Sequence, residues 1–294
     1  MSTSNDKNAT TLARTNRVWG FITRHHIQQP DGSTKSYHSR HHRKRLHSKL
    51  ISLSQIDKKG FWVSAQLNDL IGIVFAIGAA LFASGSILFL FPDLAAFWSL
   101  SANQINGIFF AGSIPFSTAA WLQLAQAANS GDFANADEIT RNGFKPFGWF
   151  PDNIGWLSCM LQFIGTLLFN LNTFDALHPG LNWFQQNLAI WIPNLFGSLL
   201  FLASGYLAFI EICHGHWAWR PRSLEWRITF INLLGCIAFL VSSLFAFILP
   251  RGSAIGDTTS LIFTLLGAIA FFIGALLLIP ESAKSRSAAA ASVY

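Results

Sequence analysis

Residues 70–91 read LIGIVFAIGAALFASGSILFLF, a long run without a single charged side chain. A helix needs about 20 apolar residues to cross roughly 30 Å of hydrocarbon, and further uncharged runs of this size follow along the chain. Backbone N–H and C=O groups find no partner in lipid, so each run is predicted to be a helix. The predicted spans are Leu70–Phe91, Ile105–Ala125, Ile154–Phe174, Leu188–Ile210, Ile228–Leu249 and Ser260–Ile279.

Composition divides the chain into two parts. Hydrophobic residues make up 51% of the sequence and charged residues only 12%, about half the fraction usual in soluble proteins. Residues 1–66, in contrast, hold 12 of the 20 Lys and Arg residues and six of the nine His residues. We therefore predict an all-α integral membrane six-helix bundle at residues 67–280. A basic, His-rich and largely disordered cytoplasmic tail precedes it at residues 1–66, and a cytoplasmic C-terminal tail follows at residues 281–294.

Lys and Arg also predict the orientation, because they concentrate in cytoplasmic loops. The loops at residues 126–153 and 213–227 carry basic residues, whereas those at 92–104 and 175–187 carry none. Arg251 is the one departure from this alternation. The pattern predicts that both termini are cytoplasmic. The polar N-terminal segment has no apolar signal core, so we expect a multi-pass protein of a bacterial inner membrane without a signal peptide.

The spans pair into three predicted helical hairpins with related features. The second helix of each carries a Phe followed three and four residues later by small residues, which let helix backbones approach closely. Phe and Gly are abundant here, so true internal repetition and chance both stay open. The residues are Phe109, Gly112 and Ser113; Phe201, Ser204 and Gly205; Phe271, Gly274 and Ala275; and, near the entry of each first helix, Asn68, Asn153 and Asn232.

The first hairpin also carries a resemblance to a known family. Its sequence reads NDLIG at residues 68–72, GSILF at 85–89 and IFFAGS at 108–113. Over about residues 60–125 it resembles the YrhK-like family of small bacterial membrane proteins. This chain is far longer, spaces its two helices differently and adds four spans. The resemblance implies a membrane-embedded two-helix unit, and the family brings no established activity.

A cluster of possible metal ligands lies at the inner end of the fourth span, at Glu211, Cys213, His214 and His216. Sulfur and imidazole together suit zinc or copper, although no close Cys-x-x-Cys pair is present. The alternative is an ordinary helix end at which a His is favourable. We expect no bound cofactor. Three cysteines are too few for a secreted disulfide framework, so we expect free thiols.

The basic tail has its densest charge at Arg40, Arg43, Lys44, Arg45 and Lys49. Anionic lipid attracts such segments by about 1 kcal/mol for each basic residue near the surface, so these side chains are predicted to contact lipid. The alternative is a disordered topology determinant. No aromatic residues interleave with the charges, and no nucleic-acid partner is expected.

Chemistry-bearing motifs are missing from the sequence, which has no phosphate-binding Gly-rich loop, zinc-binding His pair or nucleophile turn. The sequence therefore favours a protein that is not an enzyme and leaves enzymatic activity open. The spans contain no charged residue in their middle. Their main polar groups are Asn106, Gln162, Asn170, Asn194 and Asn232, which suit hydrogen bonds between helices or, alternatively, the path of a neutral solute.

These observations predict a non-enzymatic membrane component that packs against a second copy of itself or another membrane protein, with its tail on anionic lipid. The alternative is a transporter or channel for a small neutral solute, and the second alternative is a metal-dependent or redox membrane enzyme. A polar cavity through the bundle would favour transport. Ligands converging at Cys213, His214 and His216 would favour the enzyme.

Overall fold

A computed structural model of the chain describes residues 11–28, 34–44, 46, 65–130, 144–250 and 256–290. Within these ranges six helices are long and apolar enough to cross a membrane, which confirms the predicted spans. They are built on α2 (Ala65–Leu90), α4 (Ala102–Ala128), α5 (Ile154–Asp175), α7 (Ile192–Cys213), α8 (Leu224–Phe245) and α9 (Asp257–Leu276).

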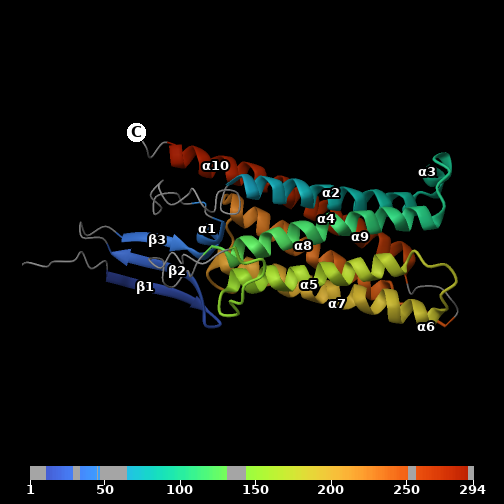
Figure 1. Cartoon of the computed structure of the whole chain (residues 1–294), viewed down its shortest axis with the longest axis horizontal. Helices are drawn as coiled ribbons and strands as arrows, with labels where there is room; N and C mark the ends of the chain where they lie inside the picture. The colour runs from blue at the N-terminus through green and yellow to red at the C-terminus, as the bar shows by residue number, and fades with distance from the viewer. Residues whose placement is uncertain are drawn as a thin grey trace, which may run out of the picture.

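Shorter elements extend or connect the spans. The helix α6 (Trp183–Gln186) and the π-helical turn η4 (Asn187–Trp191) lead directly into α7. The helix α10 (Leu278–Ala290) continues α9, and α3 (Pro92–Phe97) lies between α2 and α4. Figure 1 shows α3 and α6 at one end of the bundle, hereafter the far end.

The six spans form a closed ring. Each span packs against the next one in the sequence, and α9 packs against α2 to close the ring. Successive spans are antiparallel, so the ring consists of the hairpins α2–α4, α5–α7 and α8–α9 (Figure 1). A closed ring of helices has a central axis, and side chains from all six spans can meet on it.

Every span contains a glycine followed four residues later by a phenylalanine. Within each hairpin the two glycines lie at the helix contact: a Cβ added to Gly165 would meet the Gly197 carbonyl oxygen at 3.1 Å, and one added to Gly267 would meet that of Gly235 at 3.2 Å. Glycine is needed at these positions because the helix backbones approach so closely. The pairs are Gly78 and Phe82, Gly112 and Phe116, Gly165 and Phe169, Gly197 and Phe201, Gly235 and Phe239, Gly267 and Phe271.

These six phenylalanines form a layer across the ring, hereafter the Phe layer. All six are buried, and their rings contact one another within and between hairpins: the Phe82 ring lies 5.3 Å from that of Phe116 and 6.2 Å from that of Phe239, centroid to centroid. The structure therefore corrects the predicted hairpin alignment. The α4 residue that corresponds to Phe201 and Phe271 is Phe116, two helical turns from Phe109.

The N-terminal segment differs from the predicted disordered tail. It forms an antiparallel sheet of β1 (Thr11–Val18), β2 (Phe21–Gln28) and β3 (Thr34–His38), followed at once by the short helix α1 (Ser39–Lys44). The two-residue turn between β1 and β2 has positive φ at both positions, which matches the twist of a hairpin. Val18 packs with Ile154 and Ile210 at the ends of α5 and α7. This end of the bundle is hereafter the sheet end.

Two tryptophans at the sheet end lie inside the protein. Trp156 and Trp226 are buried, and their indole N–H groups donate to the carbonyls of Phe147 and Ala218. A buried indole needs such an acceptor, and the loops at the sheet end supply one for each.

Candidate functional site: a cation-capped cavity on the ring axis

The helix α1 carries a cluster of cations into the sheet end of the ring. Arg43 and Lys44 follow Arg40 by three and four residues, so both lie on the same side of the helix as Arg40. Their exposed fractions are 5%, 4% and 3%. Burying charge is costly unless it is paired, so the carboxylates that meet these side chains determine whether α1 can dock.

Arg43 pairs with Glu211 at the end of α7. Its Nη2 donates to the carboxylate at 2.8 Å, and the hydroxyl of Ser39 donates to the other carboxylate oxygen at 2.7 Å. Burial is the largest single influence and lowers the pKa of Arg43, but the charge of Glu211, its hydrogen bond and the nearby charges of Cys159 and Glu281 together raise the pKa above its ordinary value. The Arg43 Nη1 group faces the Cys159 sulfur at 3.7 Å. Arg43 is thus fixed as a cation between α5 and α7.

Arg40 and Lys44 share one carboxylate, that of Glu281 in α10. Arg40 donates through Nε and Nη2, the shorter contact being 2.9 Å, and the Lys44 ammonium donates at 2.6 Å. Burial, and after it the charge of Arg40, lower the pKa of Lys44 to about 8. The sixth span must extend past the bundle to present Glu281, which explains why α10 continues α9 without a break.

Two further contacts fasten α1 at the edge of the ring. His41 pairs with Glu225 at the start of α8. The side-chain amide of Asn68 donates to the Lys44 carbonyl at 3.3 Å and accepts from Gln126 at 3.2 Å. An orphan carbonyl at the end of a short helix thereby gains a partner.

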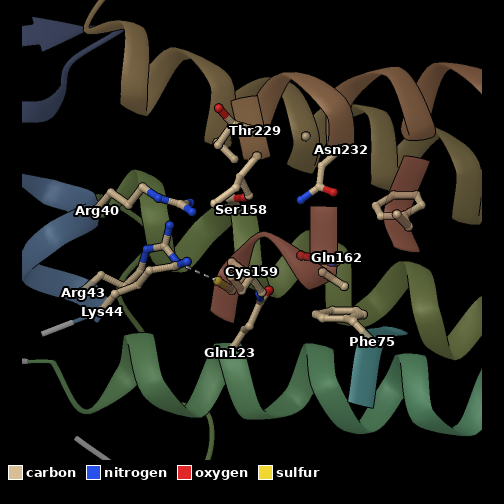
Figure 2. A pocket seen from close by; sticks show the side chains of 16 residues that line it. Arg40, Arg43, Lys44, Phe75, Gln123, Ser158, Cys159, Gln162, Thr229 and Asn232 are labelled. Atoms are coloured by element: carbon tan, nitrogen blue, oxygen red, sulfur yellow. Dashed lines mark hydrogen bonds between the residues drawn. The ribbon is translucent and has the colours of Figure 1, made fainter. Parts of the chain in front are cut away.

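Directly beneath these cations lies a cavity on the ring axis, hereafter the sheet-end cavity. Its space for the centres of water molecules is about 60 Å³, enough for a few waters. Figure 2 shows the three α1 cations at one side of this cavity and the amides of Gln162 and Asn232 on the other. Its polar lining residues are Arg40, Arg43, Lys44, Gln123, Ser158, Cys159, Gln162, Thr229 and Asn232.

A second cavity lies on the other side of the Phe layer, hereafter the far-end cavity. The centres of water molecules can occupy about 140 Å³ of it, and its lining includes the polar side chains of Asn172, Asn194 and Thr264. Phe82, Phe169 and Phe239 border it, whereas Phe271 borders the sheet-end cavity. The Phe layer therefore separates the two cavities.

The far-end cavity adjoins an open vestibule of about 380 Å³ between α4, α5 and the turn before α6. The two spaces share Asn106, Ala176 and Ile190 as lining residues. Three spaces therefore follow one another: the vestibule, the far-end cavity and, past the Phe layer, the sheet-end cavity. Among the described residues, no carboxylate lines any of them.

The four predicted metal ligands do not come together. Glu211 binds Arg43, the Cys213 sulfur lies 3.7 Å from the Ala218 carbonyl, and His216 contacts Tyr206 and Trp19. The part of the chain that the structure describes contains no group of three His, Cys, Asp or Glu residues placed to hold a metal ion. All three cysteines are free thiols, as predicted.

His214, the remaining member of that group, instead contacts the sheet. It ends α7 in a left-handed conformation, with φ of +53°, and its Nε2 lies 2.9 Å from Nδ1 of His38. Burial, and after it the neighbouring His38 and Arg24, lower the pKa of His214 to about 3. His214 is therefore neutral at physiological pH.

Three of the side chains predicted to contact lipid lie inside the protein. Arg40, Arg43 and Lys44 are buried and paired with Glu211 and Glu281, and contact of the tail with lipid stays a prediction. Arg45 and Lys49 lie outside the described residues. The tail charge thus serves an internal contact at these positions.

The polar residues of the spans divide between packing and cavities. Asn170 donates to Ser117 across the helix contact, whereas Asn106 donates to the Ala176 carbonyl and also lines the far-end cavity and the vestibule. Gln162, Asn194 and Asn232 line the cavities. Sequence reasoning missed Gln123, Glu281 and the Phe layer. The six spaced Gly and Phe pairs were the available signal for the layer.

Comparison with known protein families, with curated proteins and with solved structures gives no match for this chain. The case for its function therefore rests on the geometry of the ring and its axis.

Proposed function

We propose that this multi-pass membrane protein is a gated pathway for a small solute, closed in the conformation described above. The observation that carries the proposal is a pair of cavities, each lined by all six spans of the closed ring and separated from each other by the Phe layer, with an open vestibule beside the far-end cavity. Polar groups inside a membrane bundle are costly, and they cluster where a solute or ion passes. A protein that only packs against partners gains nothing from polar cavities on its own axis.

The Phe layer has the properties of a gate. A hydrophobic constriction blocks water and solutes by dewetting, and a small displacement of its rings rewets it. The layer draws one ring from each span, so a rotation of any hairpin moves two of the six. The glycines next to the layer leave no side chain between the helices of a hairpin, which favours movement of each hairpin as a unit.

The helix α1 is a second barrier, at the sheet end. It covers the sheet-end cavity with three cations and is held by ion pairs to α7 and α10. Because α1 follows β3 directly, movement of the sheet would pull α1 from the ring. The N-terminal segment thus acts as a plug whose release opens the sheet-end cavity.

The orientation is part of the proposal. The sheet end is placed in the cytoplasm because the Lys and Arg residues gather there, with both termini on that side of a bacterial inner membrane. Single cysteines at Pro179 and Arg222, both exposed, test this placement. A membrane-impermeant thiol reagent should label them from opposite sides, and labelling of both from one side would refute it.

Solute flux into proteoliposomes tests the pathway itself. Vesicles with the full chain are mixed with glycerol, urea or sodium nitrate, and their volume is followed by light scattering. Phe239→Ala thins the Phe layer and should raise the flux of at least one solute by about tenfold or more, a barrier reduction of about 1.4 kcal/mol.

The matched control is Phe196→Ala on the exposed face of α7, which should leave flux unchanged. Should Phe239→Ala fail to fold, Phe239→Leu keeps an apolar side chain and still removes one aromatic ring from the Phe layer. Flux equal to that of empty vesicles in the wild type and in both Phe239 variants would reject the pathway. That result would favour the packing component, with a second copy or another membrane protein as its partner.

A further inference from the structure

The lining of the sheet-end cavity has an uneven charge. Three cations line it, and none of its lining residues is a carboxylate. Glu211 and Glu281 pair with these cations from behind the lining, and Glu225 pairs with His41 at the edge. The carboxylates thus lie behind or beside the three cations, and the charged groups that face the cavity itself are all cations.

The hydrogen-bond donors of these cations are only partly used. The described hydrogen bonds use Nε and Nη2 of Arg40, and Nη1 and Nη2 of Arg43. The buried Nε of Arg43, which has no partner among the described residues, lies against Gly155 and does not serve the cavity. A guanidinium carries five N–H groups and accepts none, so the Nη1 group of Arg40 suits an acceptor-only ligand.

The opposite wall supplies uncharged donors. Figure 2 shows the Asn232 amide with its nitrogen toward the three cations, and the Gln162 side chain beside it. The Asn232 oxygen is buried without a hydrogen-bond partner, on the side where α9 carries Gly274. Glycine at that position makes room for the amide, since an added Cβ would collide with the Asn232 oxygen. The nitrogen is left for the cavity.

We infer that the sheet-end cavity is a binding site for a small monovalent anion, held between the α1 cations and the amide of Asn232. Anions are attracted to a space that only cations face, and hydrogen bonds from charged donors are the strong ones. The room for only a few waters limits the ligand to the size of a halide, nitrate or formate ion. This inference rests on the proposed pathway for its meaning, because it names the class of solute that the pathway would carry.

Binding is tested with the full chain in detergent by thermal unfolding in sodium nitrate and in sodium gluconate at equal ionic strength. Gluconate is a monovalent anion too large for the cavity, so it controls for screening. Nitrate should raise the unfolding midpoint in a saturable way, and gluconate should not. Asn232→Asp places a carboxylate opposite the cations and should weaken nitrate binding by about tenfold or more.

The matched control is Asn170→Asp, the same change at a residue of another span, α5, which donates to Ser117 and does not line the cavity. It should keep the response to nitrate. Gln162→Glu gives a second cavity variant should Asn232→Asp fail to fold. Equal effects of the two salts, or an unchanged response in both cavity variants, would overturn the anion site.

Flux separates this inference from the proposed function. Nitrate flux that is lost in Asn232→Asp supports both. Flux of glycerol or urea without nitrate binding would overturn the anion site and leave the pathway standing. Nitrate binding without flux in wild type or Phe239→Ala would uphold the site and reject the pathway.

Discussion

The two ends of the ring are built in opposite ways. At the sheet end, α1 buries its own charged side chains in the protein, and the cavity below them is small. At the far end the described cavity linings carry no Lys, Arg, Asp or Glu, and the cavity continues into an open vestibule. Buried ion pairs hold only when every partner is present, whereas neutral amides tolerate water. The difference indicates a closed end that can be released and an end that is already accessible.

The largest effect on this contrast should come from breaking a buried ion pair. Glu211→Gln leaves Arg43 buried without its carboxylate, which typically costs about 3–5 kcal/mol. The cost should appear as undocking of α1, measured by hydrogen exchange of the Ser39–Lys44 amides in the purified protein. Glu225→Gln, at the less buried His41 pair, should give a much smaller change. Equal exchange in both variants and in the wild type would contradict the plug.

At the far end, loss of one neutral hydrogen-bonding side chain should matter less. The buried Asn187 donates to the Ile248 carbonyl at 2.7 Å and accepts from its N–H at 3.0 Å. Asn187→Ala should cost about 1–3 kcal/mol, because the Ile248 groups lose their partner. The thermal unfolding midpoint should fall while exchange at α1 stays unchanged. Faster exchange at α1 in this variant would show that the two ends are not independent.

The smallest effect should be a pH dependence at the contact between sheet and ring. The pKa of His214 is about 3 in the docked state, against an ordinary value near 6.5. The undocked state therefore binds more protons as the pH falls below about 6.5, and docking of the sheet should weaken progressively toward pH 3. Of the groups around His214, His38, Arg24 and Arg220 oppose its protonation, while Glu225 favours it.

Tryptophan fluorescence of Trp19, which lies against Tyr206 and His216, can follow this transition. His214→Gly removes the titrating ring and suits the left-handed backbone at this position, so its transition should lose the His214 component. An identical pH profile in the variant would assign the effect to another group.

The sequence predicted the spans because each is an uncharged run, a local property of the chain. It did not predict the sheet, because the turn at Trp19 and Gly20 is not one of the residue pairs typical of hairpins, and the strands are polar. The cation cluster was equally hidden. Arg40 and Glu281 are 241 residues apart, and nothing local distinguishes a basic residue that binds lipid from one that enters a ring of helices.

The candidate site was predicted in part. Gln162 and Asn232 stood out as polar residues in apolar spans, and both line the sheet-end cavity. The Cys and His cluster stood out through residue type alone, and its side chains diverge because successive positions at a helix end point in different directions. The sequence analysis aligned the hairpins on Phe109, which Gly112 follows three residues later, although Phe116 is the α4 residue that joins the Phe layer.

Reaction of the native Cys159 thiol shows whether the Phe layer divides one path along the ring axis. This thiol lines the sheet-end cavity, while Thr264→Cys places a thiol in the far-end cavity. Each is examined alone, with the other cysteines replaced by alanine, using a small hydrophilic thiol reagent added at the far end. We expect the reagent to react with the thiol of Thr264→Cys. We expect the Cys159 thiol to be protected, and to react only when Phe239→Ala thins the layer. Reaction of Cys159 at one rate with and without Phe239→Ala, or no reaction of Thr264→Cys, would contradict it.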